Sequence, residues 1–343
     1  MSLRAVILAA GMGTRMRPLT LRRPKPLVPV AGRPMIEHIV GGLVSAGVRD
    51  ICLVIGYLGD QIVHALGDGT RLGARLVYRW QEHFGGTGAA VLLAEDFVGD
   101  ERFVLGWGDI IIPSRNYRRM IGMYCRERPE AVLSVNVVED PWEGAAVYVA
   151  NDHVERIIEK PPKGRSSTHY NNAGLFVFGP ELLGILRRTP LSPRGELEVP
   201  SAVMSMLQGG ARIRAFEIEG YWSDVARPAS AIAVSGEIIR DASHAGVLTH
   251  PTARVCAQAS LRPPVLVGPD AVVEAASLGP NVTVMAGAQI AAGARLHDAM
   301  VFAGAHVGEG CVLSHAIVEE WTEVAGGTCA AGSREEAIVL GGT

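Results

Sequence analysis

An aliphatic residue recurs at nearly every sixth position in the last third of this 343-residue chain. The step shortens to five residues only before Leu278 and Val301, and small or polar residues fill most positions between. A six-residue period drifts around a helix of 3.6 residues per turn and leaves no apolar stripe. Short strands stacked in coils account for the six-residue period, because each strand directs one aliphatic side chain inward. The sequence therefore predicts a parallel β-helix with Val255, Leu261, Val267, Val273, Leu278, Val284, Ile290, Leu296, Val301, Val307 and Leu313 inside.

The period resembles that of the hexapeptide-repeat proteins, which implies a left-handed coil, an exception to the usual hand of crossover connections. We place this β-helix at residues 245–325, followed by a C-terminal tail at 326–343. The stretch "RPASAIAVSGEIIRDASH" before it predicts a connecting helix and linker at 228–244.

Residues 1–227 follow a different pattern, in which short β-rich runs alternate with helical stretches. Residues 34–47 and 87–97 space their apolar side chains as a helix does, and the Asn-Asp pair within 145–160 predicts an antiparallel hairpin. The alternation predicts an α/β fold, with a Rossmann-like, mixed but mainly parallel sheet flanked by helices. Its predicted strands are residues 4–10, 50–56, 74–80, 102–109 and 131–138.

Composition excludes several classes of protein. A net charge of −3 from 32 basic and 35 acidic residues gives no general polyanion-binding surface, so nucleic acid is not an expected partner. We find no signal-peptide pattern and no apolar run long enough to span a bilayer. The five cysteines are scattered without a paired motif. We expect a cytoplasmic protein with no membrane partner and no cysteine-based metal site.

A basic, glycine-rich loop, "GMGTRMRPLTLRRPKPLVPVAG", follows the first predicted strand. Backbone N–H groups of such a loop can cradle phosphates. The loop lacks the third glycine of a dinucleotide fingerprint and the G-K-[ST] of a Walker loop. Its side-chain charge comes instead from residues such as Arg15 and Lys25. A solvated basic turn is the alternative, but prolines at 18, 24, 26 and 29 favour a loop that holds its side chains in place.

The loop and the motifs after it resemble the sugar-1-phosphate nucleotidylyltransferases, also called NDP-sugar pyrophosphorylases. In the family's order these motifs are "IGYLGDQIVHALGDGTRLG", "GGTGAAVLLAED", "GDI", "IIEKP", "NNAGLFVF" and "YWSDV". The resemblance covers nearly all of residues 1–227, and the repeats match those members that carry a left-handed β-helix. It implies the nucleotide-diphospho-sugar transferase fold.

The resemblance also implies a reaction. An NTP and a sugar 1-phosphate, or a sugar-like cyclitol phosphate, would give an NDP-sugar and pyrophosphate. The domain order and the short β-helix are most similar to those of mannose-1-phosphate guanylyltransferases. GTP is therefore the first nucleotide expected, with UTP-, dTTP- or CTP-specific members as alternatives.

Roles for the charged residues follow from the resemblance. Arg15 would grip the β- and γ-phosphates, and Lys25 would lie between the α-phosphate and the sugar phosphate. Asp109 and Asp224 would share one Mg²⁺ ion, although a single aspartate after a strand is more often a turn or helix-cap residue. The nucleotide is implied to contact Leu8, Ala10, Gly11, Gly13, Thr14, Gln81 or Glu82, Gly86 and Thr87.

The sugar phosphate is implied to lie at three further motifs. Glu159 would accept hydrogen bonds from ring hydroxyls and Lys160 would contact the phosphate, the alternative being a solvated pair at a strand end. Asn172 would bond hydroxyls, Gly174 would permit close approach, and the backbone of Gly144 would face the sugar.

Two other functions are open to a chain of this architecture. A regulatory subunit without catalysis is disfavoured because Arg15, Lys25, Asp109, Lys160 and Asp224 are all present. A second acyltransferase activity would need a histidine base in the repeats, where His297, His306 and His315 lie. The repeats are few and have no long loop, so we expect these histidines at the rim. We expect the β-helix to assemble a homo-oligomer, a dimer or larger.

Overall fold

The computed structural model describes residues 3–341, and the chain divides into two compact units. The first unit, which we call the sheet unit, consists of Met1–Met12 and Ile36–Trp222. The second, the coil unit, consists of Gly13–Met35 and Ser223–Thr343. Residues 13–35, which the sequence led us to place in a catalytic domain of residues 1–227, thus pack with the C-terminal part of the chain.

The sheet unit is built on one nine-stranded sheet with the order β5-β4-β1-β6-β11-β8-β12-β10-β9. Strands β5, β4, β1 and β6 run parallel, as do β8 and β12, whereas β11 is antiparallel to both of its main neighbours. The sheet is therefore mixed, as predicted, and all its strands except β10 and β11 run in one direction. The strands are β1 (Leu3–Ala9), β4 (Asp50–Ile55), β5 (Arg75–Trp80), β6 (Arg102–Trp107), β8 (Ala131–Val137), β9 (Ala145–Ala150), β10 (His153–Glu159), β11 (Tyr170–Phe178) and β12 (Ile213–Glu217).

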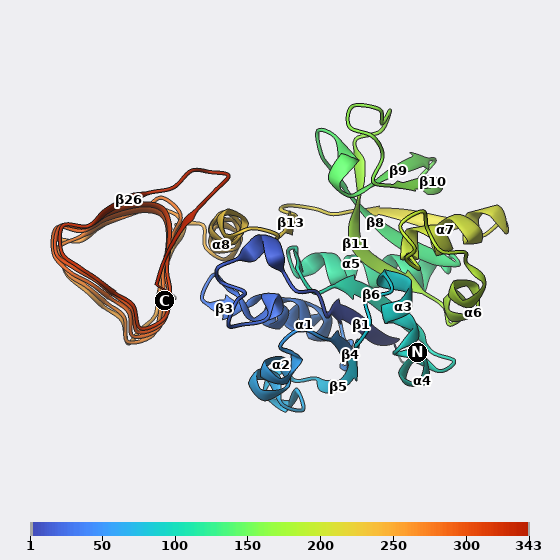
Figure 1. Cartoon of the computed structure of the whole chain (residues 1–343), viewed down its shortest axis with the longest axis horizontal. Helices are drawn as coiled ribbons and strands as arrows, with labels where there is room; N and C mark the ends of the chain where they lie inside the picture. Colours follow the sequence, from blue (N-terminus) through green and yellow to red (C-terminus); the bar gives the residue numbers. More distant parts are fainter. Residues whose placement is uncertain (1–2, 342–343) are drawn as a thin grey trace. The chain divides into compact units, whose positions relative to one another are not determined.

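Helices surround this sheet (Figure 1). The helix predicted within residues 34–47 is present over Met35–Ser45, whereas the helix predicted at 87–97 divides into two short ones. The core between sheet and helices contains Phe103, Phe176 and Phe178, and the last two rings stack with centroids 5.3 Å apart. The helices are α1 (Met35–Ser45), α2 (Gly59–Leu66), α3 (Thr87–Leu92), α4 (Glu95–Val98), α5 (Arg115–Glu127), α6 (Glu181–Arg188) and α7 (Val199–Gln208).

The predicted hairpin is present as β9 and β10 at one end of the sheet. Its turn residues Asn151 and Asp152 have φ angles of 48° and 62°. Two successive left-handed residues form the turn that matches the twist of a two-residue hairpin, and Asn and Asp tolerate that conformation well. The hairpin ends at Glu159, which it thereby positions.

The coil unit stacks short parallel strands in successive coils, which Figure 1 shows end-on as a triangle. One ladder joins Val255, Val273, Ile290, Val307 and Val324. The ladder of Leu261, Leu278, Leu296 and Leu313 and that of Val267, Val284, Val301 and Val318 form the other two sides. All eleven predicted inward positions lie in these strands, and those from Val267 to Leu313 are buried. The arrangement is compatible with a parallel β-helix, and its left-handed winding stays a prediction.

The strands of the coil unit extend beyond the predicted limit at residue 325. Strands β26 and β27 both pair with β24, so much of the predicted tail continues the stack. Helix α8 (Pro228–Ala242) precedes the coils at the predicted position. The strands are β14 (Val247–Thr249), β15 (Arg254–Val255), β16 (Ser260–Leu261), β17 (Val265–Val267), β18 (Val272–Val273), β19 (Ser277–Leu278), β20 (Val282–Val284), β21 (Gln289–Ile290), β22 (Arg295–Val301), β23 (His306–Val307), β24 (Val312–Val318), β25 (Glu323–Val324), β26 (Cys329–Ala331) and β27 (Ile338–Leu340).

Residues 13–35 pack on this coil through specific contacts. The Ala31 N–H donates to Ser235 Oγ of α8 at 2.8 Å. The Arg23 guanidinium forms a two-pronged ion pair with Glu320, with one N···O distance of 2.8 Å. The basic loop is thus fastened to the C-terminal part of the chain by hydrogen bonds and charge. Its regular elements are two 3-10 turns, Thr14–Met16 and Lys25–Leu27, and a small hairpin of β2 (Pro29–Val30) and β3 (Arg33–Pro34).

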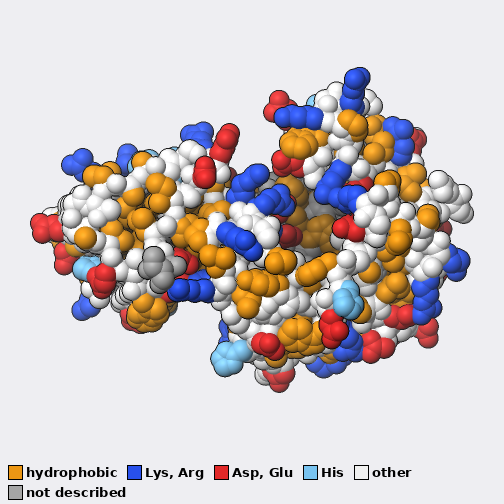
Figure 2. All heavy atoms as spheres, in the orientation of Figure 1, with side chains coloured by type: hydrophobic (Ala, Val, Ile, Leu, Met, Phe, Trp, Pro, Cys, Tyr) orange, Lys and Arg blue, Asp and Glu red, His pale blue; other side chains and the backbone are white. Residues whose placement is uncertain are grey.

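Two further observations bear on the excluded classes of protein. Among residues 3–341, no helix has both the length and the apolar character needed to cross a membrane. Basic and acidic side chains are interspersed over the face drawn in Figure 2, as the near-balanced composition predicts.

Candidate active site

A cavity of about 360 Å³ opens in the sheet unit where three of the parallel strands end. Gly11 follows β1, Gln81 follows β5 and Asp109 follows β6, and all three line this cavity. The carboxyl ends of parallel strands are where open α/β sheets bind ligands. The cavity brings together seven residues that the sequence placed at the nucleotide or metal, namely Leu8, Ala10, Gly11, Gln81, Gly86, Thr87 and Asp109. We call it the strand-end cavity.

Backbone hydrogen bonds join the loops around this cavity. The Ala10 carbonyl accepts from Tyr57 N–H at 3.2 Å, and the Leu8 carbonyl accepts from Gly108 N–H at 2.8 Å. The N–H of Gln81 donates to the Ile55 carbonyl at 2.8 Å. These bonds continue the strand pairing past the strand ends, so the cavity wall is held by the sheet itself.

The segment around Gly86 forms another wall of the cavity, and its packing requires glycine at position 86. Gly86 has a φ of 93°, and a Cβ there would collide with the Leu197 carbonyl. Leu197 bonds the same segment on both sides, with its N–H donating to Gly85 O and its carbonyl accepting from Gly88 N–H, each at 2.8 Å. Thr87 Oγ1 accepts from Val199 N–H at 3.0 Å. Residues 85–88 are therefore fixed against residues 197–199.

Four residues that sequence reasoning did not assign also line the strand-end cavity: Phe84, Ala90, Trp107 and Glu196. The Trp107 ring packs on Phe176 with centroids 5.4 Å apart. Gly174, with a φ of 77°, makes room for this ring, since a Cβ there would lie 2.5 Å from Trp107 Cδ1. The absence of a side chain at Gly174 thus accommodates an aromatic wall, and its predicted contact with the sugar stays a prediction.

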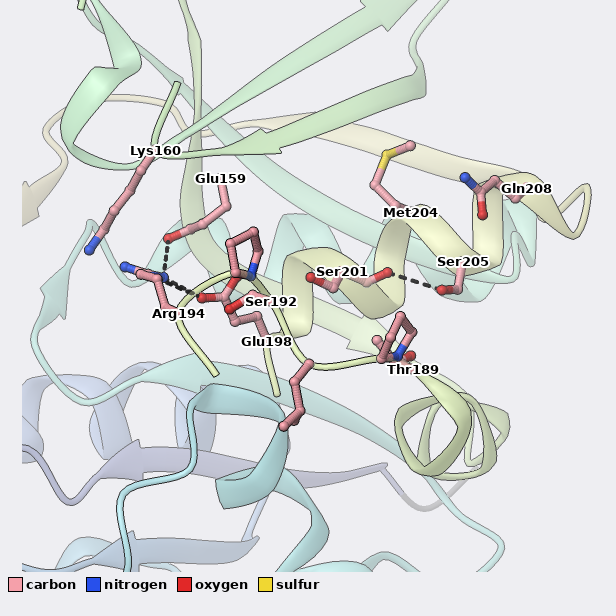
Figure 3. Close-up of a pocket in the computed structure, with 13 residues that line it drawn as sticks. Glu159, Lys160, Thr189, Ser192, Arg194, Glu198, Ser201, Met204, Ser205 and Gln208 are labelled. Atoms are coloured by element: carbon pink, nitrogen blue, oxygen red, sulfur yellow. Dashed lines mark hydrogen bonds and ion pairs between the residues drawn. The ribbon is translucent and has the colours of Figure 1, made fainter. Parts of the chain in front are cut away.

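A second cavity of the sheet unit, of about 540 Å³, contains Glu159 and Lys160 (Figure 3). We call it the carboxylate cavity. Figure 3 shows Arg194 between the carboxylates of Glu159 and Glu198. Arg194 Nη2 lies 3.5 Å from Glu159 Oε1 and forms a closer ion pair with the buried Glu198. Sequence reasoning missed Arg194 and Glu198, because the run "PRGELE" that holds them looks like a solvated loop.

Electrostatics in the carboxylate cavity perturb Glu159. Burial, and secondarily the nearby Glu198 charge, raise the pKa of Glu159, while Arg194 and Lys160 oppose the rise. Desolvation disfavours the charged carboxylate, and a neighbouring like charge adds to that cost. The charged form of Glu159 is therefore destabilised, and hydrogen bonds from donors such as hydroxyl groups would stabilise it.

The predicted sugar residues Gly144 and Asn172 lie near the base of the hairpin. The Gly144 carbonyl accepts from Lys160 N–H at 2.8 Å, which ties the two motifs together. Asn172 Oδ1 accepts from Gly174 N–H at 3.0 Å, at a register irregularity of β11. Its neighbour Asn171 is the buried amide, donating to Asn136 Oδ1 at 3.0 Å and leaving no space for a Cβ on Gly144. Gly144 is thus required by Asn171.

The remaining predicted residues belong to the coil unit. Lys25 is nearly buried, and its Nζ lies 3.6 Å from Asp224 Oδ1. Gly13 has a φ of 61° and faces Lys25, since a Cβ on Gly13 would lie 2.8 Å from Lys25 Cβ. Thr14 begins the 3-10 turn that contains Arg15. Asp109 and Asp224 are described in separate units, so their shared Mg²⁺ site stays a prediction.

Arg15 lies on a basic cavity of the coil unit. This cavity, of about 830 Å³, is lined by four arginines together with Glu335 and Glu336. Arginine is the side chain best suited to bidentate contact with phosphate oxygens. The cavity therefore offers several guanidinium groups beside two carboxylates, and its arginines are Arg15, Arg17, Arg227 and Arg334.

A mixed α/β sheet with a cavity at its strand ends is an arrangement that many nucleotide-binding enzymes share, and comparison with known proteins identifies the family. A model of the family described as Nucleotidyl transferase matches residues 4–240, and one described as GMPPB C-terminal domain matches residues 262–332. The chain belongs to the nucleotidyl transferase family and is a nucleotidyltransferase.

Curated relatives and a solved structure are similar over about two thirds of the chain. The low-salt glycan biosynthesis nucleotidyltransferase Agl11 of Haloferax volcanii is 32% identical over 243 residues, covering 70% of this chain and 67% of that protein. The bifunctional protein GlmU of Methanococcus maripaludis is 33% identical over 65% of this chain, which spans only 51% of that protein. A putative glucose-1-phosphate thymidylyltransferase of Bacillus anthracis, solved with sucrose, has a TM-score of 0.63 and 30% identity over 68% of this chain and 95% of its own.

Proposed function

We propose that this protein transfers a nucleotidyl group from an NTP to a sugar 1-phosphate, or to a sugar-like cyclitol phosphate, and releases pyrophosphate. One observation carries the proposal: a single short segment lines both cavities of the sheet unit. Glu196 lines the strand-end cavity, Arg194 and Glu198 line the carboxylate cavity, and Arg194 Nη2 lies 3.9 Å from Glu196 Oε2. Two ligands bound there would be neighbours, as a transfer between two substrates requires.

The two cavities differ in chemistry as two such substrates do. The strand-end cavity combines backbone of Gly11 and Gly86 with the amide of Gln81, a set suited to a planar base and its hydrogen bonds. The carboxylate cavity offers Glu159 as an acceptor for hydroxyl groups, with Lys160 and Arg194 as cations for a phosphate. We therefore assign the nucleotide to the first cavity and the sugar phosphate to the second.

Nucleotidyl transfer asks for position and charge neutralisation more than for covalent chemistry by the protein. In this proposal a sugar-phosphate oxygen attacks the α-phosphorus in line, and the bond to pyrophosphate breaks on the opposite side. Arg15 binds the departing pyrophosphate, and Lys25 reduces the repulsion between the two substrate anions. Gly13 and Thr14 supply the backbone beside Arg15.

The family resemblance implies Mg²⁺, and the residues present fit it. Asp109 lines the strand-end cavity with a carboxylate, and Asp224 offers another beside Lys25. Carboxylate oxygens are the protein ligands that Mg²⁺ takes, often together with substrate phosphates. Bound there, the ion would neutralise charge on the phosphate oxygens during transfer.

The base and the sugar are separate proposals. GTP stays our first candidate, supported by the match of residues 262–332 to the GMPPB C-terminal domain. The similarity to thymidylyltransferases supports dTTP about as well, and UTP and CTP remain alternatives. We also propose that the coil unit assembles a homo-oligomer, which light scattering of the intact protein would test.

A substrate matrix tests the function directly. ATP, CTP, GTP, UTP and dTTP are each combined with a panel of sugar 1-phosphates and cyclitol phosphates, with Mg²⁺ present, and pyrophosphate release is measured. We expect at least one combination to give equimolar pyrophosphate and NDP-sugar, and EDTA to stop the reaction. The proposal fails if no combination turns over, or if NTP is hydrolysed without formation of a sugar nucleotide.

A further inference from the structure

Three potential metal ligands face one another on the coil unit. His297 and Asp298 belong to β22 and His315 belongs to β24. His297 Nδ1 lies 3.4 Å from Asp298 Oδ2, and His315 Nε2 lies 4.0 Å from the same oxygen. The two imidazole rings meet edge to face with centroids 5.8 Å apart. One ligand atom from each of the three residues lies within 4.8 Å of the other two.

The coil geometry brings these residues together. In the β22–β24 ladder His297 pairs with Ser314 and Ala299 pairs with Ala316, so Asp298 and His315 occupy the same corner on successive coils. Both have left-handed backbone, with φ angles of 45° and 46°. Asn281, with a φ of 55°, occupies that corner on the coil before. The repeat therefore stacks an amide, a carboxylate and an imidazole in one line.

A chain of two hydrogen bonds that begins at α8 orients the Asp298 carboxylate. Asn281 Nδ2 donates to Asp298 Oδ1 at 2.7 Å, and Arg240 Nη2 donates to Asn281 Oδ1 at 2.9 Å. Because a guanidinium can only donate, it fixes which end of the amide faces Asp298. Gly236 of α8 leaves the space that Asn281 occupies, since a Cβ there would collide with Asn281 Oδ1. One oxygen of Asp298 is thus held from outside, and the other faces the two imidazoles.

We propose that His297, Asp298 and His315 bind a divalent transition-metal ion, of the class of Zn²⁺ or Co²⁺, on the coil unit. Two imidazoles and one carboxylate suit these ions, whereas Mg²⁺ prefers oxygen ligands alone. Metal–ligand bonds of about 2.0–2.1 Å in a tetrahedron place ligand atoms about 3.3 Å apart. The His297–Asp298 distance already meets this spacing, and rotation of the half-buried rings would bring the remaining ligand atoms, now within 4.8 Å of one another, to it. The fourth position is open to water.

The proposal gives Asn281 the role of an outer-shell partner. A metal-bound carboxylate is commonly held by a second hydrogen bond, and loss of such a partner weakens metal binding about 10–100-fold. The pair His306–Glu323 provides an internal comparison. His306 Nδ1 lies 2.7 Å from Glu323 Oε2 on another ladder, but within residues 3–341 no third His, Cys, Asp or Glu joins it at metal-binding distance.

The test is metal binding by the intact protein, stripped with chelator and then titrated with ZnCl₂ or CoCl₂ in excess Mg²⁺. We expect one equivalent of Zn²⁺ and a visible Co²⁺ spectrum typical of nitrogen and oxygen ligands. The His297→Ala and His315→Asn variants should lose more affinity than the about 10–100-fold expected for Asn281→Gly. Asn and Gly accept the left-handed conformation, so these two variants preserve the corner. The matched control His306→Ala should bind as the parent does.

Stability and activity give independent readouts. Zn²⁺ should raise the Tm of the parent but not that of the His297→Ala, His315→Asn double variant. Nucleotidyl transfer with Mg²⁺ should be unchanged in that double variant, so failure here is distinguishable from failure of the proposed function. The site does not exist if the parent binds Zn²⁺ and Co²⁺ no more tightly than the double variant, or if His306→Ala removes the binding instead.

Discussion

Lys25 and Asp224, far apart in the sequence, form an ion pair within the coil unit, with Nζ 3.6 Å from Oδ1. The Lys25 side chain is nearly buried, so each charge compensates the other where water is scarce. Removing one member of such a pair leaves the other with an uncompensated desolvation cost. In our proposal Lys25 contacts the substrate phosphates and Asp224 binds Mg²⁺. Each ligand would therefore interact with a charge that the other residue of the pair already compensates.

Substitution of Lys25 should affect both substrate binding and turnover. Lys25→Ala removes the ammonium that reduces repulsion between two anions, so we expect a higher KM for the sugar phosphate and a kcat lowered about a hundredfold. Lys25→Arg should restore little, because a planar fork does not replace a compact ammonium beside Asp224. Steady-state kinetics with each substrate varied measures the effect. An unchanged KM for the sugar phosphate in Lys25→Ala would remove Lys25 from its assigned position.

Arg15 should act mainly on kcat. If it binds pyrophosphate as charge develops, Arg15→Ala removes a contact that strengthens in the transition state, worth on the order of 3 kcal/mol or a hundredfold in kcat. Arg17 lines the same basic cavity and is the matched control. We expect Arg17→Ala to retain most of the activity. Equal losses in the two variants would mean that the cavity acts through its total charge rather than through Arg15.

The metal prediction is tested at two carboxylates. Asp109→Asn and Asp224→Asn should keep the fold but lose most of the turnover, because an amide cannot neutralise Mg²⁺. Raising Mg²⁺ should restore part of the activity if affinity alone is reduced. Circular dichroism checks the fold and pyrophosphate release the rate. Near-parental kcat in either variant would contradict its role as a ligand.

Glu159 should make stability depend on pH. Its pKa is raised in the folded protein, chiefly by burial, so the folded state binds a proton more readily than the unfolded chain. Stability therefore falls as pH rises through the interval between the ordinary and the raised pKa. Glu159→Gln should be more stable than the parent above that interval and should lose this dependence, with Arg194 still paired to Glu198. Melting curves between about pH 4 and pH 8 measure this.

The same substitution should weaken function. An amide is a poorer acceptor than a carboxylate, so Glu159→Gln should raise KM for the sugar phosphate while leaving KM for the NTP unchanged. For the stability prediction, a Glu159→Gln variant that is less stable than the parent at neutral pH would contradict the upward direction of the Glu159 pKa shift.

Sequence patterns predicted the features that short-range chemistry determines. The aliphatic residues from Val255 to Leu313 form continuous ladders, because equivalent positions of successive repeats pair with one another. The Asn151–Asp152 pair formed the expected turn because only a few residue types tolerate two left-handed positions. Gly11, Gln81 and Asp109 came together in the strand-end cavity because each follows a parallel strand that ends at the same edge.

Features that depend on long-range packing were not predicted. The antiparallel insertion of β11 between β6 and β8 reduces the parallel share of the sheet, and no local pattern encodes such a pairing. No sequence pattern separates Arg194 and Glu198 from ordinary surface charges, and only the folded chain brings Glu159 beside them. The Trp107 ring fits against a space left by Gly174, which is distant in sequence but lies on the adjacent strand β11.

The fastening of residues 13–35 to the coil unit has a consequence for chimeric proteins. Chain order alone would place a recombination point near residue 227, between the α/β part and the repeats. Such an exchange would keep Ala31 and Arg23 of one parent while replacing their partners Ser235 and Glu320 with those of another. A transplanted C-terminal half should therefore function only when residues 13–35 come from the same parent. A chimera of this protein needs two exchanged segments rather than one crossover point.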